Sequence, residues 1–300
     1  MIASQIAPSS TALAAASAQR LPALFVSHGS PMYALEPGET GPALQRWGAE
    51  LRAEFPGLQG VVLMSPHWMG RNLEVMAASQ PATWHDFGGF PQDLYGLRYP
   101  APGAPRLAQQ VAALLQAAGQ QPHLNPERPM DHGAWVPLMH LFPEADVPVV
   151  QISLPADAGP ADVYALGQAL RPLRDAGVLL MGSGSMTHNL RDFITGNRTG
   201  LDYVQAFSRW IEARITERDM AALLDWQHQA PLALRAHPTD EHFLPLFFAL
   251  GAGGPGAQAR YLSREVVYDF LAMDSFALQD PPLQAPLPQA QAGQAVQALQ

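Results

Sequence analysis

Short apolar runs alternate with amphipathic stretches along most of this chain. Each apolar run is bounded by glycine, proline or serine, which is typical of buried strands. The predicted strands lie at 23–27, 61–66, 73–78, 147–154 and 178–181, with a closing strand or hairpin at 265–276. The predicted helices, where apolar residues recur at helical spacing, lie at 42–55, 105–118, 161–176, 201–215 and 242–250. This alternation predicts an α/β fold, a single-domain sandwich with a mainly parallel or mixed central sheet flanked by helices.

Three segments depart from the alternation. The stretch 80–103 is dense in aromatic residues, glycine and proline, and a long ordered loop of that kind usually covers a functional site. Residues 1–20 lack the basic start and apolar core of a secretory signal, so we expect a disordered leader. The Pro, Gln and Ala composition of 279–300 predicts a flexible tail. The folded catalytic domain is therefore expected at 21–278.

The composition narrows the possible chemistry. Of the 300 residues, 48% are hydrophobic and 14% are charged, and the formal net charge is -9. That charge argues against a nucleic-acid partner or an anionic membrane surface, and no apolar run is long enough to span a bilayer. Because the chain has no cysteine, a bound metal would have His, Asp or Glu ligands. We expect a cytoplasmic protein that is a monomer or a small homo-oligomer.

Three histidines follow three of the predicted strands. His28 comes directly after 23–27, His67 follows 61–66, and His188 follows 178–181 after a Gly/Ser-rich stretch. In open α/β sheets, ligands bind at the carboxyl ends of the strands, and neutral imidazoles that meet there are suitable metal ligands. The pattern predicts a metalloenzyme in which these histidines share one site. For each histidine alone, the alternative is a structural role in a turn.

Two further histidines have contexts that fit more than one role. His132 precedes an apolar helix, where it is either a helix-entry residue or an acid or base whose tautomer is set by Asp131. His242 follows Thr239 and two acidic residues, a pattern typical of a helix start with Thr239 as its cap. Whether the side chain of His242 faces the interior or the solvent depends on where this helix begins, to within one helical turn.

Six short motifs contain most of these candidate residues. In chain order they are 27–32 (SHGSPM), 65–68 (SPHW), 85–91 (HDFGGFP), 131–133 (DHG), 188–191 (HNLR) and 238–245 (PTDEHFLP). Together they resemble the DOPA 4,5-extradiol dioxygenase family, within the LigB-like superfamily of extradiol ring-cleavage dioxygenases. The similarity extends from about residue 21 to about residue 276. It implies a single-domain α/β fold, a non-haem metal bound by histidines, and cleavage of a catechol ring beside its hydroxyls.

The resemblance also implies roles for individual histidines. His28 and His67 match the two metal ligands at the strand ends, and His242 matches a ligand that is a glutamate in the wider superfamily. His188 matches a residue that is either a further metal ligand or the catalytic acid or base. His132 matches a catalytic histidine near the substrate.

The leading hypothesis is a dioxygenase with a small aromatic diol and dioxygen as partners and a semialdehyde as product. His85, Phe87 and Trp68 are expected to contact the diol, with a core position as the alternative for Trp68. One non-haem divalent metal is expected. Fe(II) as the working metal follows from the resemblance, while an all-imidazole site also suits Zn(II). Two alternatives stay open: a zinc-dependent hydrolase on the same histidines, and a non-catalytic binding protein that retains the fold.

Overall fold

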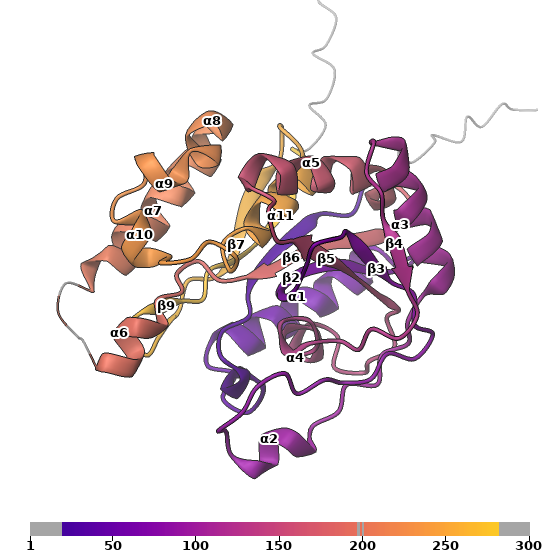
Figure 1. The fold of residues 1–300 in the computed structure, drawn as a ribbon, viewed down its shortest axis with the longest axis horizontal. Helices are drawn as coiled ribbons and strands as arrows, with labels where there is room; N and C mark the ends of the chain where they lie inside the picture. The colour runs from indigo at the N-terminus through magenta and orange to yellow at the C-terminus, as the bar shows by residue number, and fades with distance from the viewer. Residues whose placement is uncertain (1–19, 197–198, 200, 282–300) are drawn as a thin grey trace, which may run out of the picture.

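An eight-stranded mixed sheet forms the centre of the fold (Figure 1). The computed structural model describes residues 20–281 except 197, 198 and 200, so the predicted leader up to residue 19 and the predicted tail from residue 282 lie outside the described residues. The strands are β1 (Ala23–Ser27), β2 (Gly60–Gly70), β3 (Glu74–Met76), β4 (His123–Asn125), β5 (Val149–Pro155), β6 (Val178–Gly184), β7 (Gln258–Ser263) and β10 (Ser275–Gln279). A separate hairpin pairs β8 (Val266–Val267) with β9 (Leu271–Ala272). The predicted α/β fold with a mixed sheet is confirmed.

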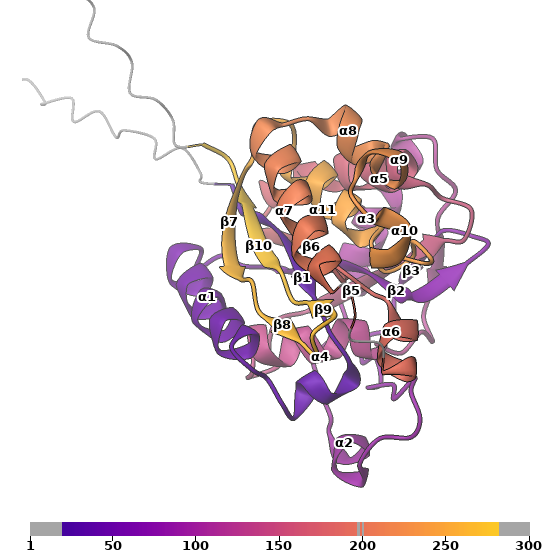
Figure 2. The same cartoon turned by 90° about the vertical axis from the view of Figure 1, so that its left-hand side faces the viewer.

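The strands run in the order β4-β3-β5-β2-β6-β1-β10-β7. The four central strands β5, β2, β6 and β1 are parallel to one another. On one side of this group β3 is antiparallel to β5, and on the other side β10 is antiparallel to both β1 and β7. Every residue of β1 and β6 is buried. Parallel strands covered on both faces are continuous apolar runs, which is why the sequence pattern located them. Figure 2 shows β7 and β10 at the edge of the sheet, next to the β8–β9 hairpin.

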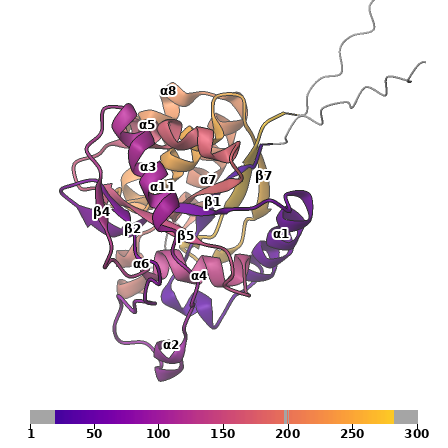
Figure 3. The same cartoon turned by 90° about the vertical axis from the view of Figure 1, so that its right-hand side faces the viewer.

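Helices cover both faces of the sheet. They are α1 (Thr40–Glu54), α2 (Gln92–Gly96), α3 (Pro105–Ala117), α4 (His132–Leu141), α5 (Pro160–Leu170), α6 (Leu190–Thr195), α7 (Asp202–Glu217), α8 (Met220–Leu224), α9 (Trp226–Gln229), α10 (Ala233–Ala236) and α11 (Pro245–Gly253), with 3-10 turns η1 (Pro31–Ala34) and η2 (Arg171–Arg174). Figure 3 shows α5 and α11 above the sheet and α1 and α4 below it. Glycines let α5 and α11 approach closely, because a Cβ at Gly167 would collide with the carbonyl of Phe248. In the described part of the chain, no helix is both long enough and apolar enough to cross a membrane.

The structure corrects several boundaries predicted from sequence. The helix predicted at 161–176 ends at Leu170 and continues as η2, because Pro172 has no N–H with which to extend the α-helical bonding. The helix predicted from His242 begins at Pro245, and its N-cap is Leu244 rather than Thr239. At the end of the domain, β10 runs to Gln279, one residue past the expected limit. The aromatic segment 80–103 contains the short helix α2, which projects from the body of the molecule (Figure 1).

Candidate metal centre and active site

Three neighbouring strands bring histidines to the same edge of the sheet. Because β2, β6 and β1 are adjacent and parallel, their carboxyl ends lie together. His28 directly follows β1, and its backbone N–H donates to the carbonyl of Gly184 at the end of β6 (2.9 Å). His188 follows the end of β6, with its N–H bonded to the carbonyl of Ala236 (2.8 Å). This arrangement agrees with the prediction that His28 and His188 lie at the same edge of the sheet.

His67 differs from the expected position. It lies inside β2, which continues to Gly70, rather than past the end of a strand. The pairing of β2 with β5 shifts register between Met64 and Met69. A bulge of this kind bends a strand and redirects its side chains. The irregularity therefore turns His67 toward the site although the chain has not left the sheet.

His242 reaches the site from a distant part of the sequence. It lies in the turn before α11, and its carbonyl accepts a hydrogen bond from the backbone N–H of Ser185 (2.7 Å). The close approach requires glycine at position 184, where a Cβ would collide with the carbonyl of His242. This contact fixes the His242 turn against the end of β6.

The imidazoles form one cluster. The Nε2 atoms of His28 and His67 are 3.2 Å apart, and one ligand nitrogen from each of His28, His67 and His242 lies within 4.8 Å of the other two. The ring of His188 stacks on that of His242 with centroids 3.5 Å apart and planes 9° apart. The ring of His132 lies 4.0 Å from that of His67. All five histidines that the sequence singled out as metal-binding or catalytic are brought together.

Hydrogen bonds on the far side of two rings determine where the lone pairs point. The hydroxyl of Ser183 donates to the carbonyl of Gly133, so it can only accept from Nδ1 of His28 (3.1 Å). The proton of His28 is then on Nδ1, and its Nε2 lone pair faces His67. On His242, Nδ1 lies 2.8 Å from the carboxylate of Glu241, which favours the same tautomer. Outer hydrogen bonds of this type are typical of histidines that bind metals.

Asp86 lies behind two other rings. One of its carboxylate oxygens accepts from the backbone N–H of His132 (2.9 Å) and lies 3.0 Å from Nδ1 of that ring. The other oxygen lies 3.5 Å from Nδ1 of His67. Burial alone would raise the pKa of Asp86, but the hydrogen bonds and charge of His132 outweigh it and lower the pKa. A charged Asp86 therefore orients both imidazoles.

Asp131 does not have the role expected for it. The sequence predicted Asp131 as the partner of His132, yet its carboxylate accepts from Ser65 Oγ (2.9 Å), Arg128 Nη2 (3.1 Å) and the side chain of Gln151. Adjacent residues at the start of α4 point in different directions, so Asp131 enters the fully buried layer beneath the site. Burial raises its pKa. The partner of His132 comes instead from the aromatic segment.

The cluster favours neutral imidazoles. Burial, followed by the neighbouring histidines, lowers the pKa of His28 and of His242 well below the ordinary value. Burial, then His132, lowers the pKa of His67 to about 3, and burial lowers the pKa of His188 to about 4. Neutral imidazole is the form that binds metals. The clustered nitrogens and their hydrogen-bonded far sides thus fit a divalent transition metal.

A cavity of about 350 Å³ opens over the cluster. Its wall combines His67, His132, His188 and His242 with apolar side chains. The apolar lining residues include Met32, Phe87, Phe90, Leu190, Phe270 and Leu271. A mainly apolar cavity with a few convergent polar groups is typical of a small-molecule site, and its aromatic walls suit a flat ring.

Two of the three predicted substrate contacts are not among the lining residues of this cavity. Phe87 lines it, but His85 lies behind Phe87, with its Nε2 3.2 Å from the carbonyl of Leu97. Trp68 is buried beneath the guanidinium of Arg128, 4.6 Å from the ring centroid, which is the core position weighed as its alternative. Residues next to a ligand in sequence point away from it in a strand, where successive side chains alternate between faces.

Sequence reasoning did not assign Ser183, Asp86 or Phe270 to the site. Asp86 had a signal, since it lies within the HDFGGFP motif beside Phe87. Ser183 lies in a Gly/Ser-rich stretch where any serine was an equal candidate. Phe270 belongs to the turn between β8 and β9, which closes over the cavity only in the folded chain.

The chain matches known proteins over most of its length. Residues 22–273 match the family model described as the catalytic LigB subunit of aromatic ring-opening dioxygenase. The chain belongs to this family. An Escherichia coli protein named 4,5-DOPA dioxygenase extradiol is 39% identical over 249 residues, covering 79% of this chain and 86% of the relative. A Beta vulgaris protein of the same name is 37% identical over 240 residues, covering 79% and 89%.

A solved structure supports the same assignment. An uncharacterized protein of Escherichia coli K12 superposes with a TM-score of 0.71 at 32% identity, covering 86% of this chain and 99% of the other. The LigB family consists of ring-opening dioxygenases, so the prediction of an extradiol dioxygenase is confirmed. The zinc hydrolase and the non-catalytic binding protein are not favoured.

Proposed function

We propose that this LigB family member opens the ring of a catechol with dioxygen to give a semialdehyde, using one non-haem divalent metal. His28, His67 and His242 are the proposed metal ligands. The observation that carries this assignment is the convergence of their ligand nitrogens within 4.8 Å. The names of the curated relatives, 4,5-DOPA dioxygenase extradiol, support a catechol as substrate.

Fe(II) is the proposed working metal. When bound, it supplies the Lewis acidity and the electron transfer that a reaction of an aromatic ring with dioxygen requires, whereas Zn(II) has no redox chemistry. Three neutral imidazoles add no negative charge, so His28, His67 and His242 would leave a bound divalent metal with its full positive charge to stabilise an ionised diol oxygen. Zn(II) stays a metal that this donor set would also bind.

His188 and His132 are the proposed acid and base. Both line the cavity and lie against the rings of the proposed ligands. His188, with its pKa lowered by burial to about 4, is neutral at neutral pH and can accept a hydroxyl proton. His132 is held by two hydrogen bonds to the Asp86 carboxylate, which keep its Nε2 directed away from that group. Phe87 and Phe90 would pack on the ring and exclude water.

The test separates metal binding from proton transfer. After anaerobic reconstitution with Fe(II), oxygen uptake and semialdehyde absorbance are followed with a panel of catechols. In His188→Ala we expect turnover to fall on the order of 10²–10⁴-fold, as for loss of an acid–base residue, while Zn(II) affinity stays near that of the wild type. His228→Ala is the matched control, because that histidine is 82% exposed and pairs with Asp225. Loss of Zn(II) binding in His188→Ala would show that His188 is a ligand.

Failure of every catechol to support oxygen uptake, despite a loaded metal site, would overturn the proposed substrate class. Substrate contacts by Trp68 and His85 stay predictions from the sequence, and neither residue lines the cavity. A cytoplasmic location and a monomeric or small homo-oligomeric state stay predictions from the sequence.

A further inference from the structure

The cavity over the histidines has an apolar wall that continues to the protein surface. Besides its four histidines, most of the residues that line it are apolar. Phe270 is only 2% exposed, so it forms a fixed part of the wall. Leu190, at the start of α6, lines the same cavity and is 49% exposed. The apolar surface of the cavity therefore extends from the buried interior to the solvent.

No aspartate, glutamate or arginine is among the described residues that line this cavity. The chain contains no lysine, so all 17 of its Lys or Arg residues are arginines. Arg128, beneath the site, already donates to the carbonyl of His67 (3.2 Å) and to the carboxylate of Asp131 (3.1 Å). Arg191 follows Leu190 in the sequence, but it is exposed and does not line the cavity. The described wall thus offers no cation to an anionic substituent of the ring.

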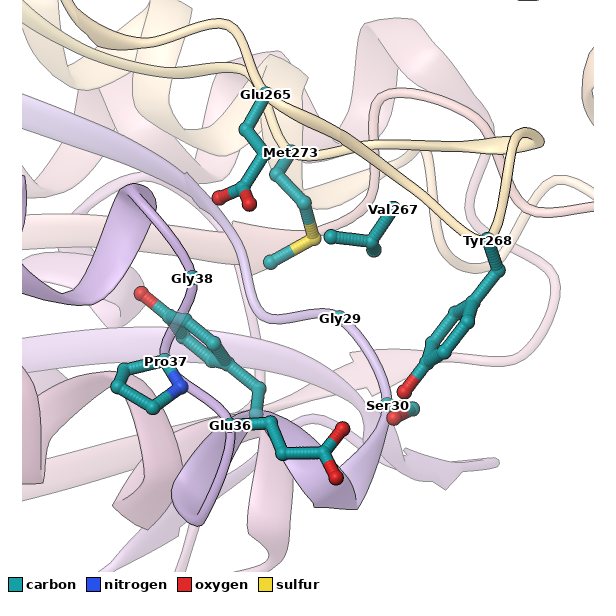
Figure 4. A pocket seen from close by; sticks show the side chains of 10 residues that line it. Gly29, Ser30, Glu36, Pro37, Gly38, Glu265, Val267, Tyr268 and Met273 are labelled. Atoms are coloured by element: carbon teal, nitrogen blue, oxygen red, sulfur yellow. The ribbon is translucent and has the colours of Figure 1, made fainter.

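The other polar groups of the wall are two hydroxyls. In the described part of the chain, Ser30 and Tyr268 are the lining residues other than histidine that carry one. The Oγ of Ser30 accepts from the backbone N–H of Met32 (3.2 Å) as the N-cap of η1. Both residues also border a second cavity of about 220 Å³, which is lined by Glu36 and Glu265 (Figure 4). A carboxylate that extended past Ser30 would approach two like charges, which is unfavourable.

We propose that the enzyme selects catechols whose ring carries an uncharged, apolar substituent, an alkyl or aryl group that packs against Leu190 and the wall behind it. The inference rests on the proposed catechol dioxygenase function and specifies the substrate class. Transfer of an apolar group from water to an apolar wall is favourable. A charged group that leaves water without gaining a partner is strongly disfavoured.

Charged tails lack partners of either sign. An ammonium group would meet only Glu36, which is exposed and therefore a weak partner. Glu265 is already occupied, since its carboxylate accepts from the backbone N–H groups of Glu39 (2.9 Å) and Thr40 (3.0 Å). DOPA, the compound in the names of the relatives, carries both an ammonium and a carboxylate on its side chain. We therefore expect DOPA to be a poorer substrate than an alkylcatechol.

Pairs of catechols with tails of the same shape test the proposal. 4-Propylcatechol matches dopamine, and 4-isopentylcatechol matches dihydrocaffeic acid, so each pair differs mainly in the charge of the tail. We expect kcat/KM of each neutral compound to exceed that of its charged partner on the order of tenfold to a hundredfold, the cost of a charged group without partners. Lengthening the neutral tail from ethyl to butyl should raise kcat/KM by about fourfold per buried methylene.

Calorimetric titration of the same compounds into the Zn(II)-loaded protein under argon measures binding without turnover. The neutral member of each pair should bind more tightly than the charged member. The heat-capacity change of binding should become more negative with each added methylene, because that change reports burial of apolar surface.

A variant that supplies the missing cation locates the tail. In Leu190→Arg we expect the ratio of kcat/KM for dihydrocaffeic acid to that for 4-isopentylcatechol to rise on the order of tenfold, because the guanidinium pairs with the carboxylate. The ratio cancels effects on the ring chemistry, since both compounds carry the same ring. Ile194→Arg is the matched control, as it adds the same charge to α6 at a residue that is 79% exposed and does not line the cavity. Urea unfolding checks that both variants fold.

The outcomes distinguish this inference from the proposed function. If the charged member of either pair is cleaved as efficiently as its neutral partner, the selection of an apolar tail is wrong while catechol cleavage stands. If no catechol is cleaved, the proposed function fails, and the calorimetric affinities of the two pairs still decide whether the cavity prefers apolar tails. No rise of the ratio in Leu190→Arg, or an equal rise in Ile194→Arg, would overturn the placement of the tail against Leu190.

Discussion

Replacing Asp86 by asparagine should weaken metal binding without unfolding the protein. Asparagine has nearly the same shape, so it can still accept from His132 N–H and Nδ1 through one oxygen. Its amide NH2 would then face Nδ1 of His67, which in the wild type lies 3.5 Å from a carboxylate oxygen of Asp86. An N–H donor there favours the His67 tautomer with the proton on Nε2. Nε2 of His67 lies 3.2 Å from Nε2 of His28, at the proposed metal site. A metal there would need the lone pair of His67 Nε2, which the proton would occupy.

The expected magnitude follows from removing the negative charge behind the two rings. A hydrogen bond to a charged group contributes about 1.5–3 kcal/mol, and loss of such an outer partner of a metal-binding histidine typically costs about 10–100-fold in metal affinity or activity. We therefore expect Asp86→Asn to weaken Zn(II) binding by about 10–100-fold. Turnover of the Fe(II)-loaded enzyme at saturating metal should fall as well, because His132 loses a charged partner.

Isothermal calorimetry with Zn(II) at constant pH measures the affinity, and urea unfolding of the metal-free protein checks the fold. Asp93→Asn is the matched control, as this aspartate lies exposed in the first turn of α2 in the same segment. If Asp86→Asn and Asp93→Asn bind Zn(II) equally well, Asp86 does not set the tautomer of His67 and the reasoning is refuted.

Two further predictions concern stability. Since burial lowers the pKa of His67 to about 3 and an unfolded histidine titrates at about 6.5, the unfolded chain binds protons that the folded metal-free protein excludes. The free energy of unfolding of the metal-free protein should be constant above about pH 6.5 and should fall as the pH drops toward about 3. An unchanged urea midpoint between about pH 7 and pH 5 would contradict this pH dependence. Gly167→Ala should lower the free energy of unfolding by about 1–3 kcal/mol, because its Cβ would push against the carbonyl of Phe248. Gly57→Ala is the control, with no atom within 4 Å of its Cβ, and equal urea midpoints for the two variants would disprove the packing argument.

The sequence by itself determined the fold class, the central strands and most of the histidine cluster. Buried parallel strands are continuous apolar runs, and β1, β5 and β6 lie where such runs occur in the sequence. The strand-end rule placed His28 and His188 at one edge because adjacent parallel strands end together. These features depend on local pattern and on general rules of topology, which a single sequence contains.

Only the tertiary structure decided how the cluster is held and what surrounds it. Asp86 and His132 are far apart in sequence, and nothing in the local pattern favours Asp86 over the adjacent Asp131 as the partner of His132. The bulge that turns His67 inward depends on the pairing of β2 with β5. The second cavity, beside Gly29 and Ser30, combines the segment after β1 with the distant Glu265 (Figure 4). Such contacts join side chains through space, and their directions are set by packing rather than by spacing along the chain.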